Sequence, residues 1–142
     1  MVKQISVFIE NKSGRLAEAT RAVGEAGVNI RALAVADTSD FGVLRFITDN
    51  TEKTVEALKS AGFTATATEV LAAEVPDRAG GLADMLELFS ANGINVEYLY
   101  AFFKKSRENA VIILKVEDKQ KTIDLLNSKN IRLMTSEEIG TL

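Results

Sequence analysis

The chain has 142 residues and a formal net charge of −3, with 17 basic and 20 acidic side chains spread evenly along it. This even spread excludes the clustered basic charge that nucleic acid or an anionic membrane surface needs. The absence of cysteine and histidine excludes disulfides, thiol nucleophiles, thiolate metal sites and the commonest general base. We therefore expect no metal site and no cofactor. We also expect a reducing cytoplasmic location, with no signal peptide and no membrane span.

The first half of the chain predicts alternating strands and helices. Ile5, Val7 and Ile9 alternate with polar residues, which is typical of a half-buried strand. The elements expected after this strand are a helix capped by Ser13 and ended by Gly27, strands at 28–36 and 42–48 joined by a hairpin turn at Asp37–Asp40, a helix at 51–61 and a strand at 63–70.

The second half predicts the same order. Its expected elements are a strand at 71–75, a helix at 80–92, strands at 94–103 and 109–116, a helix at 119–129 and a strand at 131–135. A shift of 66 residues aligns Gly14 with Gly80 and Gly27 with Gly93, and a later shift of 68 aligns Leu58 with Leu126. We therefore expect an α+β protein with two ferredoxin-like βαββαβ units, at residues 1–70 and 71–142. Each unit should have an antiparallel sheet with helices packed on one face.

Two kinds of motif carry candidate binding residues. The first is the turn from first strand to first helix, where free backbone amides and the helix dipole favour a carboxylate. The second is an asparagine two residues after each helix-ending glycine, Asn29 and Asn95. An asparagine amide can both donate to a carboxylate and accept from an ammonium. The motifs therefore suit the two charged groups of a free amino acid.

These segments resemble the ACT domains, a family of regulatory modules that bind amino acids. The resemblance rests on residues 10–30 and 75–96, where a turn and a Gly-x-Asn-[Ile/Val] motif occur together twice, and the βαββαβ order extends it over nearly the whole chain. Ala79 stands where the family's turn has a proline, and Lys12 and Ser13 depart further from that turn. The resemblance implies a non-catalytic, allosteric sensor with no catalytic residues.

The resemblance further implies that units pair, with each ligand between the turn of one unit and the second strand of another. One expected site combines Asp77, Arg78, Ala79, Gly80, Gly81 and Leu82 with Asn29 and Ile30. The other combines Asn11, Lys12, Ser13, Gly14, Arg15 and Leu16 with Asn95 and Val96. We expect the Gly80 site to bind more tightly, because Arg15 stands where the other turn has Gly81. The expected partners are a free L-amino acid, a regulated protein and a second copy of the chain in a homodimer.

Several features have a simpler interpretation. The two asparagines can satisfy backbone groups, Asp77 can stabilise its own turn, and residues 104–107 fit a solvated hairpin tip. The strip of Val96, Tyr98, Tyr100 and Phe102 fits a core or a subunit interface better than a cofactor site. The chain could then be an interaction module without a ligand.

Two other classes share the topology. An RNA-recognition module carries aromatic residues on its third strand, as residues 41–46 do, but residues 109–114 have none. An acylphosphatase-like enzyme uses an arginine in the first turn, for which Arg15 and Arg78 are the candidates. The glycine-rich phosphate loop and strand asparagine of such an enzyme are not recognisable.

Overall fold

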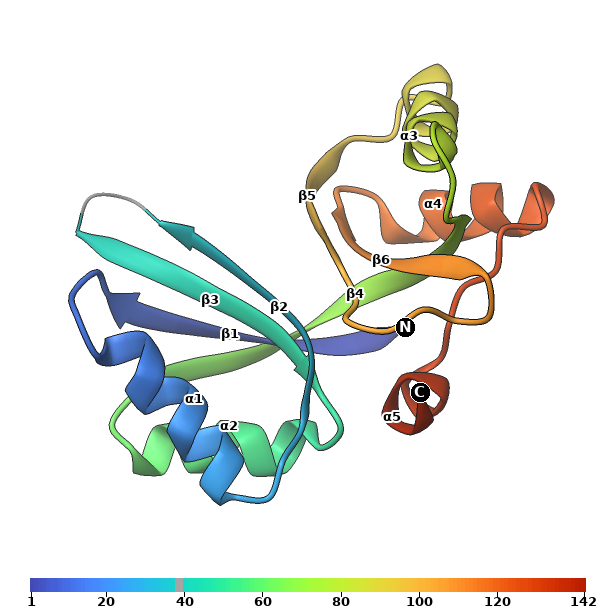
Figure 1. Cartoon of the computed structure of the whole chain (residues 1–142). Coiled ribbons are helices and arrows are strands. Elements are labelled where there is room, and N and C mark those ends of the chain that lie inside the picture. Colours follow the sequence, from blue (N-terminus) through green and yellow to red (C-terminus); the bar gives the residue numbers. More distant parts are fainter. Residues whose placement is uncertain (38–39) are drawn as a thin grey trace. The chain divides into compact units, whose positions relative to one another are not determined.

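The computed structural model describes residues 1–37 and 40–142 (Figure 1). The first elements are β1 (Val2–Glu10), α1 (Arg15–Glu25), β2 (Ile30–Asp37), β3 (Phe41–Thr48), α2 (Thr51–Ser60) and β4 (Thr64–Pro76). They are followed by α3 (Gly81–Ala91), β5 (Val96–Ala101), β6 (Asn109–Val116), α4 (Lys119–Ser128) and α5 (Ser136–Thr141). The α+β class with two βαββαβ units is confirmed. Two residues of the predicted hairpin turn, Thr38 and Ser39, lie outside the described residues.

The chain forms two compact units, and the boundary between them along the sequence lies within β4. The N-terminal unit comprises Lys3–Glu69, and the C-terminal unit comprises Val70–Gly140 together with Met1–Val2. The strand order is β2-β3-β1-β4 in the N-terminal unit and β4-β6-β5 in the C-terminal unit. The strands predicted at 63–70 and 71–75 are one continuous strand, because no glycine or turn sequence interrupts residues 64–76.

The N-terminal unit packs α1 and α2 over one face of its sheet (Figure 1). Strands β1 and β3 are antiparallel, with Val7 opposite Leu44. Because alternate strand residues point to opposite faces, Ile5, Val7 and Ile9 all enter the core under the helices. The predicted alternation of β1 therefore corresponds to a buried and a solvent-facing side.

The C-terminal unit repeats this arrangement with β4, β6 and β5. Ala73 of β4 lies opposite Ile112 of β6 in an antiparallel ladder. The residues buried between this sheet and helices α3 and α4 include Met85, Phe89 and Leu126. Met85 and Phe89 are spaced by four residues, which places both on the buried face of α3.

The C-terminal segment differs from the prediction. The strand expected at residues 131–135 is reduced to one bridge, between Leu133 and Ala73. Helix α5 follows at once, and a capping box begins it, in which Thr135 and Glu138 exchange hydrogen bonds. The Thr-x-x-Glu spacing of a capping box was readable in the sequence. This cap ends the extended segment at Thr135.

The aromatic strip on β5 is also not continuous. A register shift between Val96 and Tyr98 places Val96 and Leu99 against the core under the helices. Tyr98 and Tyr100 consequently face the other side of the strand, since side chains alternate. A β-bulge of this kind inserts a residue and reverses the alternation, so the prediction of one four-residue strip was wrong.

Candidate functional site

The first turn, residues 11–16, begins α1 without a side-chain cap. The Lys12 amide donates to the Glu10 carbonyl at 2.9 Å, and the Glu18 amide donates to the Gly14 carbonyl at 2.9 Å. The N-cap residue is Gly14, at φ 91°, and no side chain bonds to the helix terminus. The prediction that Ser13 caps α1 was therefore wrong. A positive φ is readily adopted by glycine, and here it brings the chain into the helix.

The second turn, residues 77–82, has the same backbone pattern. The Arg78 amide donates to the Pro76 carbonyl and the Asp84 amide to the Gly80 carbonyl, each at 2.9 Å. Gly80 is the N-cap, at φ 84°, again without a side-chain cap. A Cβ on Gly81 would lie 2.2 Å from the Pro76 carbonyl oxygen. Glycine at position 81 therefore avoids a clash with the Pro76 carbonyl in this turn, whereas the first turn accommodates Arg15 at the matching position.

The second helix of each unit begins differently. The Asn50 side chain accepts from the Lys53 amide at 3.1 Å and caps α2, and the Asp118 side chain accepts from the Lys121 amide at 3.0 Å and caps α4. A capping side chain satisfies the free amides of the first helical turn. The termini of α1 and α3 have no such side-chain cap, although the Arg15 amide donates to the Lys12 carbonyl at 3.4 Å and the Gly81 amide to the Arg78 carbonyl at 3.0 Å. The helix dipole at these two termini favours an external carboxylate.

Asn29 and Asn95 occupy equivalent positions. The Asn29 carbonyl accepts from the Asp49 amide at 3.2 Å, and the Asn95 carbonyl accepts from the Glu117 amide at 3.1 Å. These backbone bonds join the start of the second strand to the end of the third. Both asparagine side chains are exposed. The backbone carbonyls make the hydrogen bonds that join the strands, so the side-chain amides stay accessible.

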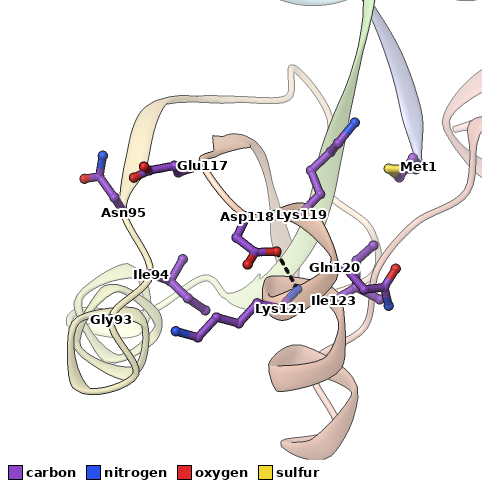
Figure 2. Close-up of a pocket in the computed structure, with 10 residues that line it drawn as sticks. All are labelled: Met1, Gly93, Ile94, Asn95, Glu117, Asp118, Lys119, Gln120, Lys121 and Ile123. Carbon is purple, nitrogen blue, oxygen red and sulfur yellow. Dashed lines mark hydrogen bonds between the residues drawn. The ribbon is translucent and has the colours of Figure 1, made fainter.

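A cavity of about 680 Å³ lies at Asn95. Figure 2 shows the side chains of Asn95 and Glu117 close to one another, with Lys121 extending past Asp118 toward Gly93. The charged groups include both carboxylates and ammonium groups. The cavity can therefore accommodate a small zwitterion beside the Asn95 amide.

Each unit has its turn and its asparagine at opposite ends of the first helix. Helix α1 has 11 residues, which corresponds to a length of about 16 Å at 1.5 Å per residue. A small amino acid cannot touch both motifs of one unit. The structure brings together the residues of each turn, and it pairs each asparagine with the loop before the second helix. The pairing of one unit's turn with the other unit's asparagine stays a prediction.

Two cations contact carboxylates at the second turn. Lys105 pairs with Asp77, and the hydrogen bond with Asp77, followed by the charge of that carboxylate, raises the pKa of Lys105. Arg78 pairs with Asp84 at 2.8 Å. Both pairs are well exposed, so each contributes little to stability. Asp77 therefore already has a cationic partner, which the ammonium of a ligand would have to replace.

At the first turn, Arg15 folds back onto its own unit. Its guanidinium carbon lies 4.5 Å from the centre of the Phe63 ring. Its Nη1 lies 2.6 Å from the Glu18 carboxylate and its Nε 3.9 Å from that of Glu10. The side chain is only 23% exposed, so Arg15 is held by charge and by the aromatic face rather than extended into solvent.

A buried carboxylate that sequence analysis missed lies near the second turn. Glu74 is 7% exposed and accepts hydrogen bonds from Ser106 at 2.5 Å, Asn109 at 3.2 Å and Arg132 at 2.5 Å. Burial raises the pKa of Glu74, but these three bonds and the Arg132 charge lower it more, and the net pKa is below its ordinary value of 4.5. The interpretation of residues 104–107 as a solvated tip was thus wrong at Ser106, which is buried.

Two further features of the described residues bear on function. Among residues 1–37 and 40–142, no helix has the length and apolar character needed to cross a membrane. In the same part of the chain, no three His, Cys, Asp or Glu side chains are grouped as metal ligands.

Two successive βαββαβ units, each with its helices on one face of an antiparallel sheet and a glycine turn before the first helix, define a paired ferredoxin-like domain. The chain belongs to the ACT domain family, because residues 1–142 match the family described as the ACT domain pair. The expected resemblance is confirmed.

Two solved structures illustrate the relationship. Protein BT0572 from Bacteroides thetaiotaomicron is 34% identical, with a TM-score of 0.91 over 99% of this chain and 96% of that one. The ligand-free regulatory subunit of aspartate kinase from Thermus thermophilus is 17% identical, with a TM-score of 0.65 over 89% of this chain and 90% of that one. The second similarity concerns the fold alone. None of the curated proteins matches the chain.

Proposed function

We propose that this protein is a non-catalytic regulator that binds a free amino acid at its first strand-to-helix turns. The observation that carries the proposal is the contrast between helix termini. Side chains cap α2 and α4, whereas α1 and α3 begin at glycines with positive φ and have no side-chain cap. Uncapped amides and the helix dipole together favour a carboxylate. Membership of the ACT domain pair family supports the same interpretation.

Each ligand is proposed to lie between a turn and the asparagine of the other unit. One site takes Asp77, Arg78, Ala79, Gly80, Gly81 and Leu82 with Asn29 and Ile30, and the second takes Asn11, Lys12, Ser13, Gly14, Arg15 and Leu16 with Asn95 and Val96. The ligand carboxylate would contact the amides of the turn, and the ammonium would contact an asparagine amide oxygen. Because α1, about 16 Å long, separates the two motifs of one unit, we propose that each site draws on both units.

The regulatory part of the proposal rests on fold. The aspartate kinase neighbour is described as a regulatory subunit, and this chain has the same fold without a histidine or cysteine for catalysis. Binding would shift the population of conformations that a protein partner recognises. We propose that the chain acts in the cytoplasm and as a homodimer.

A thermal-shift measurement with each of the twenty amino acids tests the proposal. A ligand at a hundred times its Kd stabilises the folded state by about 2.7 kcal/mol, which raises the Tm by several degrees for a chain of this size. For an amino acid that binds, Asn29→Ala and Asn95→Ala should each weaken binding, whereas Asn127→Ala, an exposed asparagine on α4, should not. If no amino acid raises the Tm, the chain is better explained as an interaction module without a ligand.

A further inference from the structure

The C-terminal unit contains a cavity of about 370 Å³ beside Gly81. Its apolar wall is formed by Val75, Met85, Leu88 and Ile131. Met85 is buried, and Leu88 and Ile131 are half-buried. The volume falls within the range typical of small-molecule sites. The cavity therefore offers an apolar surface next to the second turn.

The repeat shows what occupies the corresponding position in the N-terminal unit. In the repeat, Arg15 stands at the position of Gly81 and Phe63 at the position of Ile131. The backbone amides of Phe63 and Ile131 each donate at 2.9 Å to a carbonyl of the preceding helix. The Arg15 guanidinium lies 4.5 Å from the Phe63 ring centre. The N-terminal unit thus covers this position with its own side chain, whereas Gly81 leaves it open.

The two carboxylates that pair with Arg15 do not have two free counterparts in the C-terminal unit. Arg15 lies between the carboxylates of Glu10 and Glu18. Pro76 stands at the position of Glu10 and carries no charge, and Asp84 at the position of Glu18 is already paired with Arg78 at 2.8 Å. The open cavity therefore lacks the two free carboxylates that a guanidinium would need.

The rim of the cavity carries both signs of charge, because the carboxylates of Glu74 and Asp84 line it as well. Glu74 is paired with Arg132 and Asp84 with Arg78. Lys129 lines it at the position where the N-terminal unit has Ala61, and Arg78 lines it from the turn. The apolar wall suits the hydrocarbon part of a ligand, and Lys129 supplies a cation toward which a ligand carboxylate can point.

We infer that the cavity beside Gly81 receives the side chain of an aliphatic amino acid, with the ligand carboxylate toward the turn and Lys129. This inference rests on the proposed function and specifies the ligand class of its second-turn site. The N-terminal counterpart is closed to such a side chain by Arg15. The two turns consequently differ in selectivity, with the larger aliphatic ligand held by the C-terminal unit.

The test is a titration of the full chain with glycine, L-alanine, L-valine and L-leucine, followed by NMR of the methyl groups of Leu, Ile and Met. Affinity should rise from glycine to L-leucine, by up to about fourfold for each buried methylene. The methyl signals of Leu88 and Ile131 should shift. Leu88→Trp, which fills the cavity from the surface of α3, should weaken L-leucine binding at least tenfold and leave glycine binding unchanged.

Two variants make the result specific. Glu87→Trp adds the same bulk at an exposed neighbouring position of α3 and should leave the L-leucine affinity unchanged. Leu88→Gln, which alters polarity with little change in size, should also weaken L-leucine binding if Leu88→Trp fails to fold. Binding of any amino acid without dependence on aliphatic size, or an unchanged L-leucine affinity in the Leu88 variants, overturns the inference while the proposed function stands. Absence of binding by all twenty amino acids overturns both.

Discussion

The buried carboxylate of Glu74 makes a sharp prediction about stability. Glu74→Gln keeps the size and shape of the side chain but removes the charge that faces Arg132. It also replaces one of the carboxylate oxygens that accept from Ser106, Asn109 and Arg132 with an amide donor. The variant therefore tests whether this charge joins β4 to the β5–β6 loop and to the segment before α5.

The magnitude follows from the contacts. A hydrogen bond to a charged group contributes about 1.5–3 kcal/mol, and removing one partner of a buried pair costs about 3–5 kcal/mol. Arg132 is 42% exposed, so water screens part of its charge and the lower end applies. We expect Glu74→Gln to lower the free energy of unfolding by about 2–3 kcal/mol at pH 7. The Tm should fall by roughly 4–12 °C in a chain of this length.

The pH dependence has a defined sign. The pKa of Glu74 is lowered in the folded state, so its carboxylate stabilises the fold above the ordinary pKa of 4.5. This stabilisation is lost as the pH falls through the folded-state pKa. The difference in Tm between the wild-type protein and Glu74→Gln should therefore be full near pH 7 and should shrink below about pH 4.

The assay is thermal unfolding followed by circular dichroism between pH 7 and pH 3. Glu69→Gln is a matched control, because Glu69 is an exposed glutamate on the same strand. It should change the Tm by less than about 2 °C. If Glu74→Gln changes the Tm by less than about 2 °C at pH 7, the role assigned to the buried charge is refuted. The same holds if the Tm difference from the wild-type protein does not change with pH.

Three further predictions concern the turns. Arg15→Ala should lower stability by about 1 kcal/mol in a urea titration through the lost contact with Phe63, and a loss no larger than that of an exposed control, Arg21→Ala, would contradict the contact. Gly81→Ala should destabilise the fold by about 1–3 kcal/mol, because its Cβ would lie 2.2 Å from a backbone oxygen. Its control is Gly24→Ala, which has open space around the Cβ and should be neutral or stabilising by up to about 1 kcal/mol. For an amino acid that binds at the second turn, Lys105→Ala should increase affinity at low salt in calorimetry, since Asp77 loses its present partner; unchanged affinity would argue against a contact between Asp77 and the ligand ammonium.

Much of the fold could be predicted because its signals are local. The alternation of Ile5, Val7 and Ile9 identifies a strand with one buried side, and Gly27 and Gly93 end their helices at positive φ. The shift of 66 residues aligned Gly14 with Gly80, and both glycines have a positive φ at the start of a helix. The bulge after Val96 could not be predicted, because it depends on the register of β5 against β6 rather than on the sequence of β5.

The site was less predictable, because its electrostatics depend on distant residues. Glu74 belongs to an apolar strand, and its partner Arg132 is 58 residues away, so no spacing rule joins them. The pairing of Asp77 with Lys105 is equally non-local. The expectation that Arg15 distinguishes the two turns depended on a local comparison, but the direction of its side chain depends on Phe63, at the far end of the unit's sequence.

The two units show how one backbone can carry two different charge arrangements. The carboxylates of Glu18 and Asp84, at matching positions of the first helices, are both paired with an arginine. In the N-terminal unit that arginine is Arg15, which begins the helix and lies over the unit's own core. In the C-terminal unit it is Arg78, which comes from the turn and is 59% exposed. The same ion pair is thus preserved by residues at different positions, and only the C-terminal arrangement leaves the helix start unobstructed. Transferring an arginine to position 81 is blocked by the Pro76 carbonyl, so the tight turn and the open cavity depend on the same glycine.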